Sequence, residues 1–408
     1  MRIGMVSACY KPVINGVTRM VSLYKEQLTA AAHDVTVFTL GEPDPAGDEP
    51  GVIRSPAIPL GDTGYYFSTH YSRQARERLQ EMEIIHCHHL FMSVEMAHRY
   101  GRCPIVYTNH TRYDLYTGAY IPLPQPAADA LMRQIWPDFT DYCDVVITPS
   151  ESVRQVMLDF GVRRPIEVIE NGVELQPFLH PSRPLRKRDF NIPDQDILLV
   201  YVGRLASEKN LTTLVEQFVI AHDLVPRLRL MLVGKGPLHD DLRSQVYAAG
   251  VADRVHFTGP VAYDQVPNYL AAADLFVTAS VTEVHPLTVI EAMAAGLPVA
   301  AVSSPGIVDT VESGKSGWLT NFAEGGLAAA MVSLATNTPL RQRLAAGARQ
   351  ASQRFDIRDT VSRTVNLYER LRETRPDLLR DHEHGRWQRA RERRQQFVEQ
   401  LAGLLRPE

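Results

Sequence analysis

Two glutamates, Glu283 and Glu291, flank a short turn in the stretch TASVTEVHPLTVIEAMAAGLPVAA, which spans residues 278–301. The letters DLFVTAS predict a buried strand, and VIEAMAAGLPV predicts a helix that ends at Gly296. Glu283 would lie in the loop, where it could meet a sugar, and Glu291 early in the helix, where it could accept hydrogen bonds from a ribose. Backbone amides near PLTV could hold a phosphate. The alternative interpretation is one capping carboxylate and one surface carboxylate, since acidic residues are common near helix starts.

Two cations, Arg204 and Lys209, follow the predicted strand ILLVYVG in the stretch YVGRLASEKNLTTLVEQF. The residues after them predict a helix with Asn210 as its cap. A guanidinium and an ammonium beside free amides at a helix start make an anion site, and a pair of phosphates fits it. A surface turn with solvated charges explains the same residues equally well.

Two glycines after predicted strands supply weaker signals of the same kind. Gly16, in INGVTRMV, opens a predicted helix and would let the backbone approach a ligand closely. Gly236, in VGKGP, lies in a second glycine turn. Neither belongs to a G-x-G-x-x-G series, so each predicts little by itself.

The elements that must position these residues alternate between short apolar runs and helical patterns. Brief runs rich in valine and isoleucine predict buried parallel strands. They span residues 2–8, 34–40, 83–88, 104–110, 144–150 and 166–173, and then 197–205, 228–236, 253–259, 274–280 and 297–303. Two such series in tandem predict two doubly wound domains, with the active site in the cleft between them because ligands bind outside the carboxyl ends of the strands.

The boundary between the two series is the stretch NGVELQPFLHPSRPLRKRDFNIPDQD, residues 171–196, which is punctuated by proline and rich in charge. Its basic letters RPLRKRDF could bind an anion. A solvated linker or helix face is the simpler interpretation.

Composition excludes several classes of protein. A length of 408 residues predicts two domains, at about 100–200 residues each. A net charge of −4 gives no general attraction to nucleic acid. The cysteines form no C-x-x-C pair or disulfide framework, so we expect reduced thiols in a cytosolic protein. The start, MRIGMVSACY, predicts no signal peptide, and no apolar run reaches the ~18 residues of a membrane span.

Together the motifs resemble the retaining glycosyltransferases of family four, which have the GT-B fold. The resemblance runs from residue 1 to about residue 370 in the family's order, and the co-occurrence is specific although each motif alone is not. The motifs are INGV (14–17), TNHT (108–111), VITPSESV (146–153), ENGVE (170–174), VGRLASEKN (202–210), VGKGP (233–237), HFTGPV (256–261) and the E-x7-E element with EAMAAGLPVAA (291–301).

The resemblance implies a role for each matching position. Arg204 and Lys209 would hold the donor diphosphate, and Glu291 would bind the ribose. Glu283 would contact the transferred sugar, and His110 would lie against sugar and acceptor, which makes these two the implied catalytic residues. The implied donor-binding positions are Gly16, Arg204, Lys209, Gly236, Val261, Leu287, Thr288 and Glu291.

The chain departs from the family between the two glutamates, where EVHP replaces the common EGFG. Family members that glycosylate lipids tend to have ETQG at these positions, and EVHP is closer to ETQG than to EGFG. Pro286 removes one backbone N–H, which leaves open which amide would contact the phosphate.

Two other stretches look like metal sites. HCHH, at 86–89, could bind zinc, but adjacent residues on a strand point to opposite faces, so one ion cannot easily take all four. DQD, at 194–196, precedes a strand, which favours a turn. The family generally needs no metal for the diphosphate, so we expect neither metal nor cofactor.

Several segments bear on the acceptor. TEVHPLTVIEA and TNHTRYDLY resemble glycosyltransferases that act on diacylglycerol. The tail at 386–408 combines a basic start with an apolar face, which could lie on an anionic membrane; a helix packed on the protein is the simpler interpretation. The apolar stretches at 64–71 and 126–142 fit a lipid-facing surface and ordinary packing equally.

We therefore expect an α/β protein of the GT-B type, with two Rossmann-like domains facing a central cleft. Residues 1–172 would form the acceptor side and residues 173–355 the nucleotide-sugar side. Residues 356–408 would form C-terminal helices that pack back on the first domain, ending in a basic amphipathic tail.

The expected function is transfer of a hexose from a nucleotide diphosphate sugar to an acceptor hydroxyl, with retention. A UDP-sugar is preferred to a GDP-sugar, and diacylglycerol or a related membrane lipid is the leading acceptor. The alternatives are transfer to a soluble sugar or polysaccharide precursor, a GT-B sugar-nucleotide epimerase and a non-catalytic sensor. We expect no nucleic-acid partner and a cytoplasmic location, with peripheral attachment to the inner face of the cell membrane left open.

Overall fold

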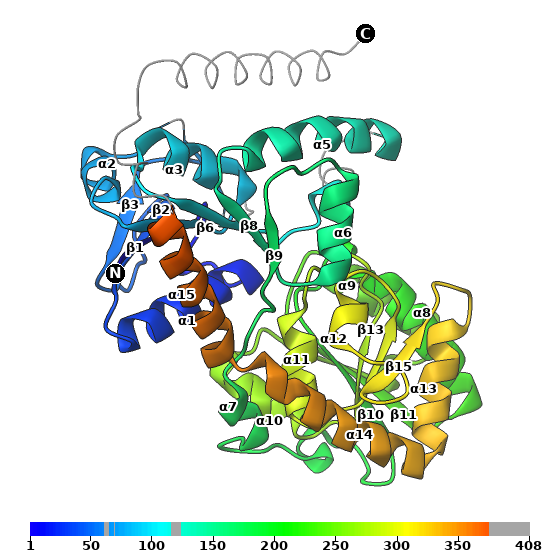
Figure 1. Cartoon of the computed structure of the whole chain (residues 1–408). Coiled ribbons are helices and arrows are strands. Elements are labelled where there is room, and N and C mark those ends of the chain that lie inside the picture. The colour runs from blue at the N-terminus through cyan, green and yellow to red at the C-terminus, as the bar shows by residue number, and fades with distance from the viewer. Residues whose placement is uncertain (61–64, 69, 116–123, 375–408) are drawn as a thin grey trace.

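Two separate parallel sheets organise the structure, a computed structural model that describes residues 1–60, 65–68, 70–115 and 124–374 (Figure 1). The first sheet defines the N lobe. Its strands, in spatial order, are β3 (Val52–Ser55), β2 (Asp34–Leu40), β1 (Arg2–Val6), β6 (Ile84–Cys87), β7 (Ile105–Thr108), β8 (Val145–Thr148) and β9 (Ile166–Val168). The second sheet defines the C lobe. Its strands are β12 (Val255–Gly259), β11 (Leu228–Val233), β10 (Ile197–Val202), β13 (Leu275–Thr278), β14 (Val299–Val302) and β15 (Gly317–Thr320).

Both sheets have a doubly wound order, in which the first strand lies in the interior and the chain builds outward to each side. The strand order reverses between β1 and β6 in the N lobe and between β10 and β13 in the C lobe. These points are where ligands bind in such sheets. The predicted fold class, two Rossmann-like α/β units, is confirmed.

Helices cover both sheets. In the N lobe they are α1 (Gly16–Ala30), α2 (Arg73–Leu79), η2 (Leu90–Val94), α3 (Glu95–Tyr100), α5 (Gln125–Thr140) and α6 (Glu151–Asp159). In the C lobe they are α7 (Leu175–Leu179), η3 (Lys187–Phe190), η4 (Ser207–Lys209), α8 (Leu211–Leu224), α9 (His239–Ala248), η5 (Ala252–Arg254), η6 (Tyr263–Gln265), α10 (Val266–Leu270), α11 (Leu287–Ala294), α12 (Ile307–Thr310), α13 (Gly326–Thr336), α14 (Thr338–Ser352) and η7 (Gln353–Phe355). None of the helices in the described ranges is both long and apolar enough to cross a bilayer.

The apolar runs form strands because both faces of each sheet are covered. Every residue of β10 is buried, and its side chains alternate between two core clusters. Leu199 and Tyr201 pack on one face, whereas Leu198 and Val200 pack on the other. A continuous Val/Ile/Leu run is what such a two-sided strand requires.

Sequence patterns missed β3, β15 and a small antiparallel pair formed by β4 (Ile58–Pro59) and β5 (Tyr66–Phe67). β3 is only half-buried and carries Arg54, and β15 begins with a glycine and exposes Trp318. Short edge strands with polar or exposed positions lack the apolar run that identifies a central strand.

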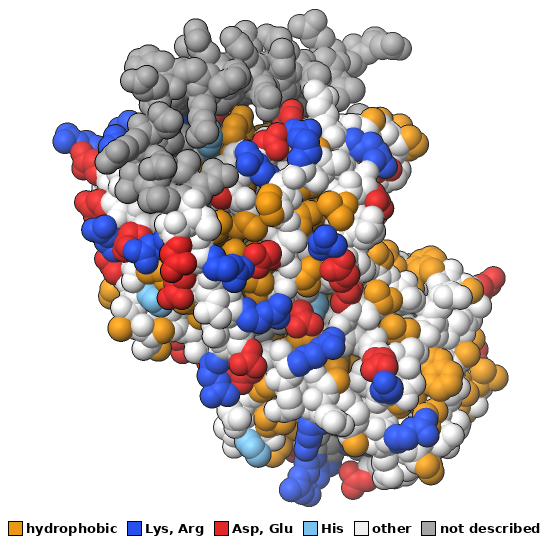
Figure 2. All heavy atoms as spheres, viewed as in Figure 1, with side chains coloured by type: hydrophobic (Ala, Val, Ile, Leu, Met, Phe, Trp, Pro, Cys, Tyr) orange, Lys and Arg blue, Asp and Glu red, His pale blue; other side chains and the backbone are white. Residues whose placement is uncertain are grey.

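The last described helix, α15 (Ile357–Thr374), returns to the N lobe and lies against α1 (Figure 1). Its apolar side joins the core cluster that contains β1 and α1. Two buried polar contacts add to this packing: Tyr368 Oη lies 2.6 Å from His86 Nδ1, and Tyr24 Oη lies 3.0 Å from Thr364 Oγ1. Basic and acidic side chains are interspersed on the face that α15 shares with its neighbours (Figure 2).

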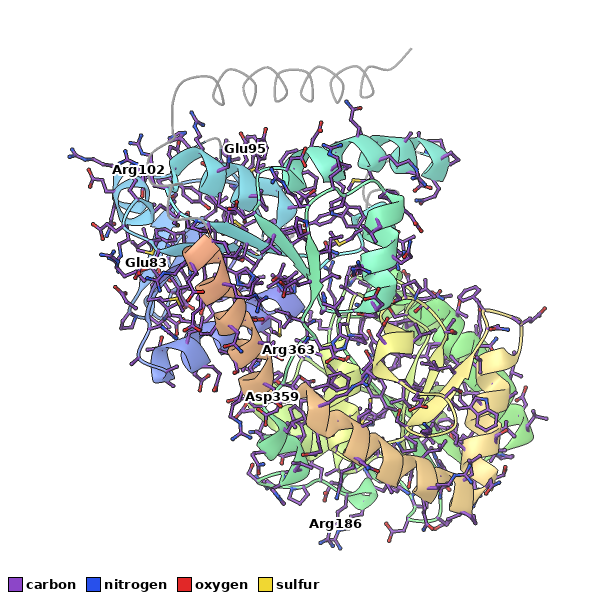
Figure 3. All side chains as sticks on the ribbon, viewed as in Figure 1. Glu83, Glu95, Arg102, Arg186, Asp359 and Arg363 are labelled. Atoms are coloured by element: carbon purple, nitrogen blue, oxygen red, sulfur yellow. The ribbon has the colours of Figure 1, made fainter. Side chains whose placement is uncertain are left out.

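The two connections between the lobes run side by side just before α15. The Val173 amide donates to the Phe355 carbonyl (2.9 Å), and the Ile357 amide donates to the Val173 carbonyl (3.1 Å). Gly172 lies at this crossing, where an added Cβ would stand 2.5 Å from Cα of Ile357. Asp359 and Arg363, labelled in Figure 3, lie on α15 where it leaves the crossing.

Gly172→Ala is expected to destabilise the protein, because the new methyl group would collide with backbone that cannot rotate away. Overpacking of this kind costs about 1–3 kcal/mol of unfolding free energy. Gly16→Ala is the matched control, since a Cβ there meets no atom within 4 Å. Thermal and urea unfolding would measure the difference, and equal midpoints for the two variants would refute the close packing of the crossing.

Candidate active site

Four of the predicted site residues follow strands at which the order of a sheet reverses. Gly16 follows β1, the pair Arg204 and Lys209 follows β10, and Glu283 follows β13. Because the carboxyl ends of parallel strands meet at one edge, the two C-lobe loops are neighbours. Their contacts with each other define the candidate site.

The loop after β10 carries the two cations. The Arg204 side chain is 56% exposed and its Nη1 lies 3.9 Å from Glu208 Oε1, a loose pair that leaves the guanidinium facing solvent. Lys209 ends the short helix η4. Asn210 occupies the N-cap position of α8 in a left-handed conformation, but its side chain makes no cap; Nδ2 instead donates to the Ala279 carbonyl (3.3 Å) after β13. The predicted capping role was therefore wrong, because the side chain ties two loops together.

Lys209 and Glu283 form a largely buried ion pair. Lys209 Nζ donates to Glu283 Oε1 at 2.7 Å, and Ser280 Oγ donates to the same oxygen at 2.7 Å. Burial alone would raise the pKa of Glu283, but the charge of Lys209 and these two hydrogen bonds outweigh it and hold the pKa below its usual value. Glu283 is therefore an ionised carboxylate beside a cation.

Glu291 lies in a different environment, in the middle of α11. It is 3% exposed, and the Tyr263 hydroxyl donates to its Oε1 at 2.7 Å. Burial raises its pKa to about 7, against the opposing effects of the Tyr263 hydrogen bond and the Arg19 charge. This carboxyl therefore changes its charge near neutral pH.

The helix α11 begins at Leu287, with Pro286 as its N-cap residue. The amides of Leu287 and Thr288 belong to the first turn, where a helix has no acceptor of its own for them. Pro286 lies before these amides, so the N–H that it lacks is not one of the helical ones. His285 is buried, and within the described residues neither of its ring nitrogens has a hydrogen-bond partner.

Gly236 lies in the loop after β11, which packs against the loop after β10. A Cβ at Gly236 would stand 2.2 Å from the Leu205 carbonyl oxygen, so only glycine lets this turn lie on the loop that follows Arg204. Val261, after β12, is partly buried against the core cluster that includes Ile290. Gly16 begins α1 on the N lobe, and the space that a side chain would take there is open.

His110 belongs to a group of histidines near the carboxyl ends of β6 and β7 in the N-lobe sheet. Its Nε2 lies 3.1 Å from His88 Nδ1 with the rings stacked, and the His88 ring centroid lies 4.2 Å from that of His86. Burial lowers the pKa of His110 and of His86 to about 3, so both rings are neutral. Cys87 points away into a different core cluster, as expected for adjacent positions on a strand. Within the described ranges, no three histidine, cysteine, aspartate or glutamate side chains are arranged so that they could hold a metal ion.

The remaining predicted features lie outside this group of residues. Asp196, of DQD, pairs with Arg229 (2.8 Å), and Lys187, of the basic cluster, pairs with Asp274 (2.7 Å). Arg186 lies at the end of the C lobe remote from the N lobe (Figure 3). Trp136, in the apolar stretch at 126–142, is fully buried, which favours packing there. The tail at 386–408 lies outside the described residues.

Sequence reasoning missed Ser280, Tyr263 and Arg19. Ser280 contacts Glu283 three residues further along the same loop, and a serine in a loop carries no sequence signal for such a contact. Tyr263, in η6, contacts Glu291, in α11, across 28 positions of the chain, and no spacing rule predicts that contact. Arg19 carried a weak signal, since it lies one turn after Gly16 on a helix expected to face the cleft.

Comparisons with known proteins point to one family. A family model described as Glycosyltransferase Family 4 matches residues 14–177, and one described as Glycosyl transferases group 1 matches residues 182–351. An alpha-monoglucosyldiacylglycerol synthase of Acholeplasma laidlawii is 31% identical over 343 residues, 79% of this chain and 86% of that protein. A protein of the same name from Streptococcus pneumoniae is 29% identical over 353 residues, 83% of this chain and 79% of that protein.

Solved structures agree on the fold. Anabaena Alr3699/HepE in complex with UDP superposes with a TM-score of 0.72 at 20% identity, covering 91% of this chain and 100% of that one. The sucrose-phosphate synthase of Thermosynechococcus elongatus gives 0.72 at 22% identity, covering 91% and 99%. At these identities the likeness establishes the GT-B architecture alone.

Proposed function

This chain belongs to the group 1 glycosyltransferases of family 4, and on that premise we propose that it moves a hexose from a UDP-sugar to diacylglycerol or a related membrane lipid, with retention of configuration. The observation that carries the proposal is the Lys209–Glu283 contact beside Arg204, at the strand-order reversal of the C lobe. This contact places a lysine that can bind a phosphate next to a glutamate that can bind a sugar.

The donor would lie with its diphosphate against Arg204, Lys209 and the first amides of α11. The leaving diphosphate gains negative charge as the glycosidic bond breaks, so fixed cations and helix amides stabilise the transition state more than the ground state. Gly16 and Gly236 would let backbone approach the same group. The UDP in the complex with the Anabaena structure supports a nucleotide of this type.

Retention follows most simply if the acceptor attacks from the face that the diphosphate leaves, with a phosphate oxygen accepting the acceptor's proton. Glu283 would then stabilise the positive charge that develops on the sugar. Its Oε1 already accepts two hydrogen bonds, which reduces its power as a nucleophile and supports this electrostatic role. His110, being neutral, would bind a sugar or acceptor hydroxyl.

The acceptor assignment is supported by the two relatives that are named as alpha-monoglucosyldiacylglycerol synthases and by the EVHP variant. Both relatives are matched over at least 79% of their length, so the acceptor lobe is included in the match. A soluble sugar acceptor is the competing outcome of the test below.

Glu291 should make donor binding depend on pH. Ribose hydroxyls donate to the ionised carboxylate, and its pKa of about 7 means that it gains a proton as the pH falls through neutrality. The Kd of UDP-glucose, whose diphosphate does not titrate in this range, should rise about tenfold from pH 8 to pH 6. Glu291→Gln should bind weakly at both values, with a flat profile by calorimetry. A wild-type profile in that variant would contradict ribose binding.

A screen of UDP- and GDP-hexoses against diacylglycerol in mixed micelles and against soluble sugars tests the function directly. We expect an α-glycosyl lipid from a UDP-hexose, with the anomer read by NMR. Transfer only to soluble acceptors would replace the lipid assignment. An epimerised donor formed without acceptor would instead favour an epimerase, and a β-linked product would exclude retention.

A further inference from the structure

Tyr263 touches both lobes at the candidate donor site. It follows β12 at the start of η6, and its hydroxyl donates to Glu291 Oε1 at 2.7 Å. The guanidinium carbon of Arg19, on α1 of the N lobe, lies 3.9 Å from the centre of the same ring. One side chain thus holds the carboxylate assigned to the ribose and supports a cation from the opposite lobe.

Arg19 is itself fixed at the junction between the lobes. Its Nη2 donates to Glu174 Oε2 at 2.8 Å, and Glu174 immediately precedes α7 on the connection into the C lobe. Its Nε is buried and has no hydrogen-bond partner among the described residues. Stacking of a guanidinium on an aromatic face is favourable and strengthens as water is excluded.

We infer that Tyr263 is a positioning residue of the donor site. Its hydroxyl orients the Glu291 carboxylate, which would bind the ribose, and its ring packs against the guanidinium of Arg19. Residues of both lobes thereby position Glu291. This inference rests on the proposed role of Glu291. A carboxylate has about four lone-pair sites, so the Tyr263 bond at Oε1 leaves Oε2 to receive a ribose diol. Tyr263 therefore acts with the ribose and does not compete with it.

Burial raises the pKa of Glu291, and Tyr263 and Arg19 are the groups that act against this effect. On the packed elements, α7 has no titratable side chain, and α10 contributes Tyr269, whose ring packs on Phe190. Arg349, on α14, bonds to the Ala295 carbonyl beyond the end of α11. Both the hydroxyl and the guanidinium favour the ionised form of Glu291, which is the form that accepts hydrogen bonds from ribose hydroxyls.

The test compares Tyr263→Phe with the control Tyr269→Phe, using UDP-glucose binding by the full chain from pH 5.5 to pH 9. Losing a hydrogen bond to a charged group should move the midpoint of the Tyr263→Phe profile about one pH unit to the alkaline side. Its Kd at pH 7 should rise several-fold, whereas Tyr269→Phe should match the wild type. Because phenylalanine keeps the ring, a role in packing alone would leave the midpoint unmoved.

Arg19→Gln gives a second, independent variant on the other lobe. It should move the midpoint in the same alkaline direction, since it removes a positive charge that favours ionised Glu291. If the pH profiles of Tyr263→Phe and Arg19→Gln both kept the wild-type midpoint while Glu291→Gln gave a flat profile, the role of Tyr263 would be overturned. The ribose assignment of Glu291 would remain intact. A Glu291→Gln profile identical to that of the wild type would overturn the ribose assignment itself.

Discussion

Lys209→Ala lowers kcat/KM for the donor by about 10²–10³-fold, if the ammonium stabilises the leaving diphosphate as we propose. Removing one fixed donor from a site of developing negative charge has effects of that size in other enzymes. The variant also leaves Glu283 as a buried carboxylate without its cation, which raises the pKa of Glu283 and weakens its electrostatic role. Steady-state kinetics with a nucleotide sugar and acceptor would measure the loss.

Lys187→Ala is the matched control for this variant. Lys187 also forms a 2.7 Å pair with a C-lobe carboxylate, Asp274, and the two lysine side chains are 15% and 21% exposed. Lys187→Ala therefore removes a comparable ion pair at a position outside the candidate site. Wild-type kinetics for Lys209→Ala, or equal losses in the two variants, would contradict the assignment of Lys209 to the diphosphate.

Glu283→Gln should lower kcat by a comparable factor, about 10²–10³, while changing the Kd of the donor much less. Glutamine keeps the size of the side chain and can still accept from Lys209 and Ser280, but it cannot offset the positive charge that forms on the sugar. An interaction made mainly in the transition state affects kcat more than binding. Single-turnover rates alongside equilibrium binding would separate the two effects.

The same residue distinguishes the two routes to retention. If Glu283 were a covalent nucleophile, wild-type protein mixed with donor alone would gain a hexosyl group on the peptide that carries Glu283. The same-face route predicts no such adduct. Intact-protein and peptide mass spectrometry would detect it, and its appearance would overturn the route proposed here.

Much of the fold was predictable because its signals are local. A run such as ILLVYV becomes β10 because both of its faces are buried, and the pattern is visible in six consecutive letters. The edge strand β15 was missed because its four residues carry no apolar run. The cap assigned to Asn210 was wrong because a tertiary acceptor, the Ala279 carbonyl, took the side chain.

The contacts at the candidate site were less accessible to the same reasoning. His86 pairs with Tyr368 across 282 positions of the chain, and Lys209 meets Glu283 across 74. Residue types and the family resemblance identified Glu283 and Lys209 as site residues, but independently of each other. Only the packing of two loops against each other makes them a pair and holds the pKa of Glu283 below its usual value. Burial within α11 raises the pKa of Glu291 instead, and that burial is likewise a property of the folded protein.

A crystal structure with a UDP-sugar bound would test the central claim, that the donor pyrophosphate is held by the cations that follow β10. We predict pyrophosphate oxygens within hydrogen-bond distance of the Arg204 guanidinium and Lys209 Nζ, with the ribose on Glu291. A pyrophosphate that lies away from the Arg204 side chain would contradict the account.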